Sequence, residues 1–442
     1  MSRSERHAKK KTRMKPRFFV ILLALLAILA IVVFVWKPFA KPDVTDPPDD
    51  PNAQTGETTD PTPEGPPEPP PDEIVSLSIL CAGDAMVHRS QWLAADRGDG
   101  TYDFTAPFRF IKPYVEAADL AIVNVETTFA GDPPEGYPSF CAPDEFADAL
   151  RWAGFDVANT CNNHMYDKWS KGLYRTIQVA RDANLATVGS HYTWERPYTI
   201  MDVKGLRVAL ITATYETYTG TATHAVNGIE IAADDYPMIN AFRSTDYSFS
   251  EEEYAADRAK LTGWIRDAKA EGADIVVCFL HWGWEYNLDA SEGQKRLAKD
   301  LADAGADILF GSHPHIPQTA DQITTSDGRT VPVYYSLGNL ISNQRRETLP
   351  TTPNNINTEE AVLGRVNVTY NKTKGTLETV TADAIPCWLD KYTAGGATQY
   401  ALVPLLSGFE SNEALLASGH LDRAKDALER MTAIVGEEFI AK

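Results

Sequence analysis

Two histidines one residue apart, His313 and His315, follow the apolar run of residues 306–310. Four other apolar runs end in the same way, on residue types that bind metal ions or transfer protons. Carboxylates, imidazoles and amides gathered in one place can hold divalent cations and activate water for hydrolysis. The five groups, in chain order, are Asp84 with His88, Asn124 with Glu126, Asn163 with His164 and Asp167, His281 with Glu285, and His313 with His315.

Each of these residues also has an ordinary structural interpretation. A single histidine after a strand is often a hydrogen-bonded turn residue, Asp84 could cap a helix, and Asn162 with Asn163 suits a turn. Five such groups favour a shared site instead, because the pocket of an open α/β sheet lies outside the carboxyl ends of its strands. The sequence therefore predicts a metal site where these loops meet.

The mixture of ligand types narrows the choice of metal. Imidazole, carboxylate and amide donors without thiolate suit Mn, Fe or Zn, and they argue against a structural zinc, which normally draws on cysteine. So many donors exceed the needs of one tetrahedral ion, and two ions roughly 3.5–4 Å apart would use them all. We therefore expect one or two divalent ions per chain.

The elements that must position these residues alternate between strands and helices. Short apolar runs ended by Gly, Asn or polar turns predict strands, and the amphipathic stretches between them predict helices. This order predicts an α/β fold whose central strands are buried on both faces. The expected strands lie within residues 75–83, 118–126, 155–163, 185–190, 206–214, 273–281, 306–313 and 331–339, and the expected helices within residues 144–154, 172–184, 251–272 and 291–305.

Other segments of the globular part follow a different pattern. Residues 363–389 predict antiparallel hairpin strands beside the sheet, and residues 411–441 predict a closing pair of helices. Residues 213–250 show no clear element and are interpreted as a long loop, which is a candidate lid. We place the main domain at residues 74–405 and a C-terminal helical segment at residues 406–442.

The N-terminal region predicts a membrane anchor. Residues 18–36 contain no charge and no proline, and as a helix they are just long enough to cross a hydrocarbon core of roughly 30 Å. The basic residues before this run predict a cytoplasmic tail at residues 1–17 and an extracellular globular part, held in the cell membrane by a single pass. A cleaved signal peptide is the alternative, but the apolar run is long and no small-residue cleavage site follows it. Residues 37–73, rich in Pro and acidic residues, predict a disordered stalk.

Charge and cysteine content limit the partners and the compartment. The formal net charge is −20, and residues 1–41 hold ten Lys/Arg and one acidic residue, so the remainder carries −29. This charge excludes non-specific nucleic-acid binding, and a polyanionic ligand would need metal ions or a local basic patch to receive it. Cys81 and Cys278 lie inside apolar runs and are expected to be buried thiols, although the sequence leaves one disulfide among the five cysteines open.

Six ordered motifs resemble those of the CapA family of poly-γ-glutamate capsule biosynthesis proteins. They are GDAMVHR, NVETTFAG, NNHMYDKWSKGL, HWGWEY, GSHPHIPQ and YSLGNLI, and the resemblance covers roughly residues 76–345. The membrane anchor and the stalk match that family's layout. The family in turn is similar to calcineurin-like metallophosphoesterases, which implies a layered α/β/β/α sandwich with a two-metal site at the strand ends.

The resemblance also implies a role for each matching residue. Asp84 and His315 would bind the first ion, His281 and His313 the second, so the two neighbouring histidines would serve different ions. Glu126 would be the bridging carboxylate, Asn163 an amide ligand, and His164 the acid beside the leaving group. The remaining candidates for contact with the substrate are Arg89, Asp167, Glu285 and Asn339.

The sequence departs from the phosphoesterase pattern at the first ion. The usual Asp-x-His opening reads Asp84-Ala85-Met86, so one histidine is missing, and His88 lies two positions too late to replace it. Glu126 stands where Asp is usual. Arg89 could meet an anionic group of the substrate, or it could form an ion pair with Asp84 or Glu126.

Two functions remain open at this stage. One is a metal-dependent hydrolase or transferase that acts on a phosphoester or amide in the synthesis of an anionic envelope polymer such as poly-γ-glutamate, with His164 and Arg89 as catalytic residues. The other is a non-catalytic assembly or export factor that binds the polymer beside other membrane proteins of the capsule machinery. A purely structural role would leave the motif series without a reason.

Overall fold

The computed structural model of the chain describes residues 71–442. The predicted cytoplasmic tail, the predicted membrane span at residues 18–36 and residues 37–70 of the predicted stalk lie outside these residues. Within residues 71–442, no helix combines the length and the apolar character needed to cross a bilayer.

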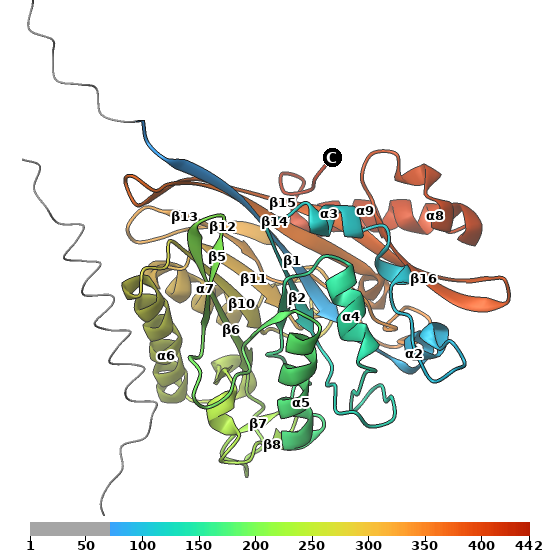
Figure 1. Cartoon of the computed structure of the whole chain (residues 1–442), viewed down its shortest axis with the longest axis horizontal. Helices are drawn as coiled ribbons and strands as arrows, with labels where there is room; N and C mark the ends of the chain where they lie inside the picture. The colour runs from blue at the N-terminus through green and yellow to red at the C-terminus, as the bar shows by residue number, and fades with distance from the viewer. Residues whose placement is uncertain (1–70) are drawn as a thin grey trace, which may run out of the picture. The chain divides into compact units, whose positions relative to one another are not determined.

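Two β-sheets form the centre of the described structure (Figure 1). In the first sheet, β1 to β4 run parallel, and β14 to β16 extend it antiparallel beyond β1. Its strand order is β16 (Ala397–Pro404), β15 (Thr376–Ala394), β14 (Glu360–Asn371), β1 (Ile74–Ala85), β2 (Leu120–Val125), β3 (Val157–Asn159) and β4 (Ala186–Val188).

The second sheet has a parallel centre with antiparallel edges. Strands β6, β10, β11 and β13 are parallel, while β12 and β5 close the two edges antiparallel. Its order is β12 (Ala320–Thr324), β13 (Thr330–Tyr334), β11 (Ile308–Ser312), β10 (Ile275–His281), β6 (Leu206–Tyr215) and β5 (Thr199–Val203), and β9 (Ala241–Phe242) pairs with β6. A separate ribbon joins β7 (Ala225–Val226) to β8 (Ile229–Glu230).

Helices α4 and α5 cover the outer face of the first sheet, α6 and α7 cover that of the second, and α8 and α9 join the core between the sheets. Helices α4 and α5 lie on one side of the sheets and α6 on the other (Figure 1). The α-helices are α2 (Arg89–Ala95), α3 (Lys112–Glu116), α4 (Glu145–Trp152), α5 (Trp169–Asp182), α6 (Glu251–Ala270), α7 (Glu292–Ala304), α8 (Glu413–Ser418) and α9 (Leu421–Val435). The short 3-10 turns are η1 (Ala106–Phe108), η2 (Tyr236–Met238), η3 (Thr245–Tyr247), η4 (Asn355–Glu359) and η5 (Phe409–Ser411).

Alternation along the strands explains the layers. On β1, Ile79 points between the sheets with Phe279 and Phe310 of the second sheet, whereas Leu80 points outward to Phe146 of α4. The second sheet repeats the pattern: its outward residues pack with the inner faces of α6 and α7. Because successive side chains of a strand face opposite ways, a strand with two apolar faces requires a layer on each side. The predicted layered α/β architecture is confirmed.

The C-terminal third completes the first sheet. Strands β14 to β16 form the antiparallel extension expected from residues 363–389. The closing pair of helices is also present: apolar residues of α8 and α9, such as Leu415 and Met431, join Trp388 of β15 in the core. These helices belong to the same compact unit as the rest of residues 70–442.

All five cysteines are buried free thiols, so the disulfide that the sequence left open is not formed in this structure.

Residues 213–250, predicted to be a long loop, contain several short elements. They hold the end of β6 and the elements β7, β8, β9, η2 and η3. Elements of two or three residues have no readable periodicity, because tertiary contacts and not local patterns fix them.

A glycine contact fixes the end of β1 where the predicted site begins. A Cβ atom on Gly83 would lie 2.0 Å from the carbonyl oxygen of Gly338, in the loop that follows β13. The backbones are bonded on either side of this contact, since the Asp84 N–H donates to the Gly338 oxygen at 3.0 Å and the Ile341 N–H donates to the Asp84 oxygen at 3.2 Å. The loop after β13 therefore runs directly beside Asp84.

Substituting Gly83 tests this close approach. Gly83→Ala should destabilise the protein by roughly 1–3 kcal/mol, because backbone atoms that cannot rotate away must shift. Gly263→Ala is the matched control: Gly263 lies inside α6 with open space around it, so the same substitution should stabilise by about 0.5–1 kcal/mol. Urea unfolding of both variants measures the difference, and equal effects of the same sign would contradict the assigned contact.

Candidate metal centre

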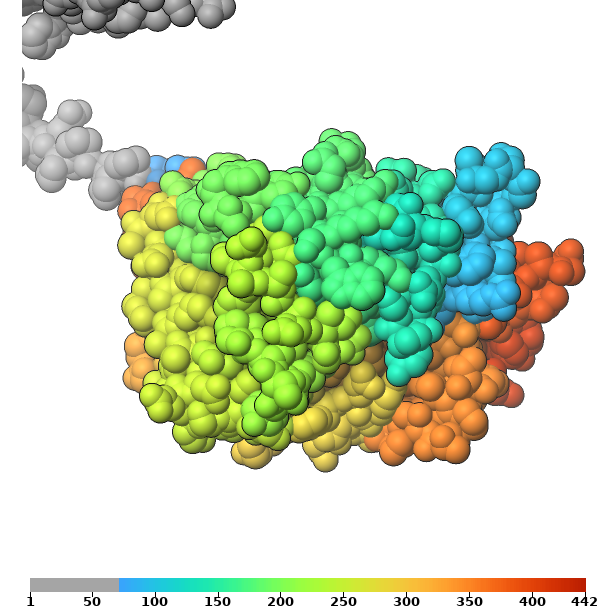
Figure 2. All heavy atoms as spheres, turned by 90° about the horizontal axis from the view of Figure 1, so that it is seen from below, coloured from blue at the N-terminus to red at the C-terminus, as the bar shows by residue number. Residues whose placement is uncertain are grey.

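The loops at the carboxyl ends of both sheets bring the predicted donors together. Asp84 and His281 lie at the ends of β1 and β10, Glu126 follows β2, Asn163 follows β3, and His313 with His315 follows β11. Figure 2 shows the molecule from below: the teal segment after β2, the green to yellow-green segment after β6 and the orange loop after β13 are all visible there. The Nε2 atom of His281 is 2.9 Å from Asn163 Oδ1 and 3.7 Å from Glu126 Oε1. The donors therefore share one centre.

Glu126 is the residue that most clearly requires a counter-charge. Its side chain is fully buried, and neither carboxylate oxygen has a hydrogen-bond partner. Burial, the nearby negative charge of Asp84 and the charge of Glu285 raise its pKa well above the usual range. A buried carboxylate without partners is unfavourable unless a proton or a cation neutralises it.

The donor atoms fall into two groups that share Glu126. One group is Asp84, Glu126 and His281, and the other is Glu126, His313 and His315; within each, the donor atoms lie within 4.8 Å of one another. A shared carboxylate agrees with the bridging role expected for Glu126, and both groups have the chemistry that Mn, Fe or Zn accepts.

The grouping differs from the expectation that His313 and His315 serve different ions. Both histidines lie in the same donor group, while His281 lies in the other. Each has a positive φ angle, 101° for His313 and 61° for His315, a conformation that costs of order 1–3 kcal/mol in a residue other than glycine. The Nδ1 atom of His313 is buried without a hydrogen-bond partner. The unusual backbone thus turns both rings toward Glu126.

The orientation of the rings is fixed by contacts on their far sides. His281 Nδ1 lies 2.8 Å from Ser312 Oγ, which leaves Nε2 facing Glu126 and Asn163. His315 Nδ1 lies 3.0 Å from Asp84 Oδ2 and 3.1 Å from Asn339 Oδ1, which leaves its Nε2 3.8 Å from Glu126 Oε1. Such outer contacts select the tautomer and hold a ligand in place.

These contacts also change the interpretation of Asn339. Its amide is fully buried, and its Nδ2 donates to Gln344 Oε1 and to the Thr358 oxygen. All of its polar atoms are therefore used inside the protein. Asn339 therefore positions His315, and its buried, fully bonded amide does not fit the substrate contact that the sequence predicts.

The protonation states of the buried groups suit cation binding. Burial would raise the pKa of Asp84, but the hydrogen bond and charge of His315, with smaller effects from His281 and Asn124, lower it to about 2. Burial lowers the pKa of His281 to about 3 and that of His313 well below the usual value. Burial would also lower the pKa of His315, yet the hydrogen bond and charge of Asp84 raise it. His281 and His313 are therefore neutral and can donate a lone pair.

A second arrangement lies beside the donors. His164 Nδ1 is 2.7 Å from Asp167 Oδ2, and the same carboxylate accepts the N–H of Phe140 at 2.7 Å. Asn227, in the turn between β7 and β8, donates to Asp167 Oδ1 at 3.3 Å. Asp167 is buried, so it orients His164 and is not available to bind substrate, contrary to the expectation. The Nε2 atom of His164 is left to exchange a proton.

Two predicted substrate contacts are solvent-exposed. Arg89 is the first residue of α2, and among residues 71–442 no ion pair joins it to Asp84 or Glu126, so that alternative is not formed. Glu285 is exposed on the loop after β10, and its charge contributes to the raised pKa of Glu126. Arg89 thus remains free for an anionic group, and Glu285 lies close enough to influence the centre.

Some residues around the candidate metal centre were not identified from the sequence. Tyr215 has a ring 4.6 Å from that of His313 and belongs to an apolar strand run, so its pattern indicates only core. Ser312 precedes the histidine pair and carries no signal of its own. His88, which lies two positions too late to replace the missing histidine, is in neither donor group; its Nδ1 accepts the Asn343 N–H at 3.2 Å.

The centre lies within a recognisable family segment. Residues 78–344 match the family described as "Bacterial capsule synthesis protein PGA_cap". The chain belongs to this family. The resemblance to CapA is thereby confirmed.

Curated relatives agree with this family. The chain is 30% identical to the capsule biosynthesis protein CapA of Bacillus anthracis over 276 residues, which are 61% of this chain and 60% of that protein. It is 27% identical to the PGA biosynthesis protein CapA of Bacillus subtilis (strain 168) over 283 residues, 62% of this chain and 64% of that protein. The chain thus spans less than two thirds of the length of these relatives.

Solved structures resemble the chain only distantly. A hypothetical protein from Thermus thermophilus has a TM-score of 0.40 and 14% identity, and covers 70% of this chain and 99% of its own. A novel phosphatase of Mycoplasma pneumoniae has a TM-score of 0.41 and 12% identity, with 71% and 95% coverage.

The buried carboxylate predicts a pH-dependent stability. In the presence of a chelator, Glu126→Gln should be more stable than wild type by roughly 1–3 kcal/mol at pH 8. The pKa of Glu126 is higher in the folded protein than its ordinary value of 4.5. Below pH 4.5 the carboxyl group is protonated in both states, and its burial adds no charge penalty. As pH rises from 4.5 through the folded-state pKa, wild type loses stability relative to the Gln variant. The difference in unfolding free energy should therefore shrink toward pH 5.

Adding Mn²⁺ at pH 8 provides the control for that comparison. Wild type should then become the more stable protein, because a cation that binds only the folded state stabilises it by an amount that grows with the logarithm of its concentration divided by its Kd. If the difference in unfolding free energy between the two proteins changes neither with pH nor with added Mn²⁺, Glu126 has another partner.

Proposed function

We propose that the chain is a metal-dependent hydrolase or transferase that acts on an envelope polymer during capsule synthesis. The observation that carries the proposal is the buried, unpartnered Glu126 carboxylate shared by two histidine-containing donor groups. In this proposal Asp84, Glu126, Asn163, His281, His313 and His315 hold one or two ions of Mn, Fe or Zn. A bound divalent ion would supply Lewis acidity and lower the pKa of water.

The chain's own residues would carry the proton transfers. His164, held through Nδ1 by Asp167, presents its Nε2 to the leaving group and donates a proton there. The exposed guanidinium of Arg89 would bind an anionic group of the substrate. The scissile bond would be a phosphoester or an amide such as the γ-glutamyl bond of poly-γ-glutamate.

One feature favours the second function, a polymer-binding assembly or export factor without catalysis. The metal donors and His164 are almost completely buried, His164 being the most exposed of them at 4%. Asn227 in the β7–β8 ribbon also lies 3.3 Å from His164 Nδ1. Catalysis would therefore require movement of the segments that bury these side chains, among which the β7–β8 ribbon belongs to the predicted lid.

We also propose that residues 18–36 anchor the protein in the cell membrane, with its N-terminus in the cytoplasm and residues 71–442 outside. The charge asymmetry around the apolar run supports this topology. Other membrane proteins of the capsule machinery would then be its partners, together with the anionic polymer. Protease treatment of intact cells should remove the globular part and leave the N-terminal tail protected.

Metal content tests the centre directly. The purified full-length chain, reconstituted with Mn, Fe or Zn, should hold at least one ion per chain. His281→Ala and His313→Ala should each lower that content, because each removes a donor from a different group. Elemental analysis after gel filtration measures it, with Trp194→Ala, an exposed residue, as the control. A metal-free wild type whose melting ignores added Mn²⁺ would argue against hydrolysis.

Activity separates the two functions. His164→Ala should keep its metal but lose roughly 10²–10⁴ of kcat on a chromogenic phosphodiester or on poly-γ-glutamate, because the proton donor is gone. Asp167→Asn should reduce kcat less and alter its pH profile, since it acts through His164. If His164→Ala matches wild type in both assays and in capsule formation, the assembly function replaces the proposal.

A further inference from the structure

A cationic pocket is lined by residues that follow the segment matched by the family. It has a volume of about 260 Å³, and its charged lining residues are Arg345, Lys391, Arg423 and Glu347. The family match ends at residue 344. In a chain of net charge −20, three cations gathered around one hollow need a physical reason.

Lys391 is the member with no acidic partner. Its Nζ atom donates to Asn343 Oδ1 at 2.7 Å and lies 5.4 Å from the centre of the Tyr400 ring. Within residues 71–442 no carboxylate forms an ion pair with it. Burial and the positive charge of Arg345 lower its pKa, so the ammonium is held in an unfavourable place.

The two arginines of the pocket share their acidic partners with each other and with Arg346. The buried carboxylate of Glu359 lies 3.4 Å from Arg345, 3.2 Å from Arg346 and 2.9 Å from Arg423. The Nε atom of Arg423 is buried without a hydrogen-bond partner. The other acid, Glu347, has a side chain that is 55% exposed and lies 3.6 Å from Arg345 and 3.1 Å from Arg423. Glu347 and Glu359 thus match the two arginines, and within the described residues Lys391 is the lining cation left without an ion pair.

One loop connects the pocket to the metal centre. Asn339 contacts His315, and four residues later the Asn343 N–H donates to His88 while Asn343 Oδ1 accepts from Lys391. Arg345 then lines the pocket itself. A group bound at Lys391 would be separated from His88 by a single residue.

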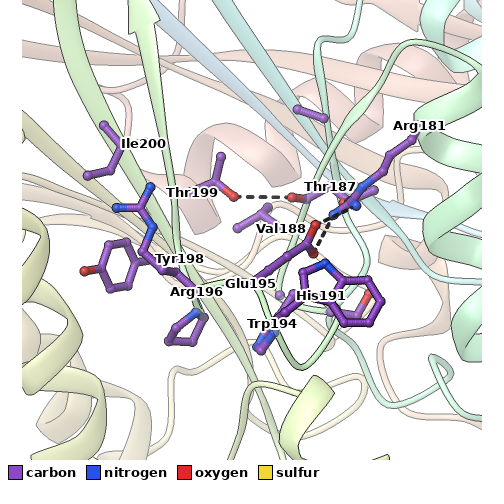
Figure 3. Close-up of a pocket in the computed structure, with 14 residues that line it drawn as sticks. Arg181, Thr187, Val188, His191, Trp194, Glu195, Arg196, Tyr198, Thr199 and Ile200 are labelled. Atoms are coloured by element: carbon purple, nitrogen blue, oxygen red, sulfur yellow. Dashed lines mark hydrogen bonds and ion pairs between the residues drawn. The ribbon is translucent and has the colours of Figure 1, made fainter. Parts of the chain in front are cut away.

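A second cavity offers a comparison, because each of its arginines is paired with a carboxylate. Figure 3 shows this hollow of about 460 Å³, lined by residues of β4 and β5, in which Glu195 points to Arg181. That pair makes two contacts of 2.9 Å, and Arg196 forms an ion pair with Glu271. Its cations are matched by carboxylates one to one, so it offers no attraction for an anion.

We propose that the pocket of Arg345, Lys391 and Arg423 binds an oxyanion, a carboxylate or a phosphate, of the polymer on which the metal centre acts. The inference rests on the proposed function for the polymer, but not on catalysis. The anion would supply the counter-charge that Lys391 lacks. Bound there, it would hold one repeat of the polymer at a fixed position beside the centre.

The test is binding of labelled oligomers to the full-length chain in detergent. Fluorescence anisotropy would compare a fluorescein-labelled γ-glutamate decamer with a labelled glycerol-phosphate oligomer, and the tighter probe identifies the anion as carboxylate or phosphate. Lys391→Gln should weaken that binding roughly tenfold and Lys391→Glu further, because a partly buried charge-assisted hydrogen bond is lost. Lys391→Arg should retain most of the affinity.

Lys374→Glu is the matched control, since it makes the same charge change at the opposite end of β15, in the turn where Lys374 pairs with Asp72. It should change the affinity less than twofold. Equal weakening by Lys374→Glu and Lys391→Glu, or binding of both probes no tighter than that of labelled dextran, would overturn the proposal.

Metal content and phosphodiester hydrolysis, measured on the same variants, separate this site from the proposed function. Lys391→Glu should leave both unchanged for a small chromogenic substrate. Lys391-dependent binding without any hydrolysis would reject catalysis while keeping the anion site, and hydrolysis without Lys391-dependent binding would do the reverse.

Discussion

The buried carboxylate of Glu126 is the constraint on which the rest of the site depends. Folding removes it from water and gives neither of its oxygens a hydrogen bond, and the nearby carboxylate of Asp84 adds repulsion. A side chain in that position destabilises the protein unless positive charge is supplied. His281 and His313 are neutral and cannot supply that charge, whereas the raised pKa of His315, 3.8 Å from Glu126, lets its imidazolium supply part of it. The donor set at Glu126 therefore fits a divalent cation better than a polar network closed by hydrogen bonds.

The fold maintains this arrangement through backbone contacts between neighbouring loops. Gly83 lets the end of β1 touch the loop after β13, and that loop returns Asn339 to His315. On the second sheet, a Cβ on Gly311 would lie 2.2 Å from the Tyr335 oxygen, so the strand that leads to the histidine pair is equally close to its neighbour. Donors on five loops stay in register because the loops are bonded to each other and not only to their own strands.

Much of this could be predicted from sequence, and the remainder could not for identifiable reasons. Apolar runs ending in Asp84, Glu126 and His281 mark strand ends directly, since hydrophobic periodicity reports which segments are buried. The allocation of His313 and His315 depends on left-handed backbone angles that no pattern indicates. The roles of Asp167 and Asn339 depend on which partner fills each hydrogen bond. Asp167 contacts His164 in its own loop and also the Phe140 N–H, and Asn339 contacts His315 on another loop.

The charge of the protein brings the two halves of the proposal together. A surface this acidic repels an anionic polymer at long range, because each added carboxylate meets the field of the whole domain. Attraction must then be local, and our proposals locate it in two places: a cation bound at the donors around Glu126, and the pocket at Lys391. The loop of residues 339–345 contacts both. A polymer held at both points would have one repeat fixed near the donors around Glu126. The rest of the polymer would be repelled by the acidic surface, which favours its release.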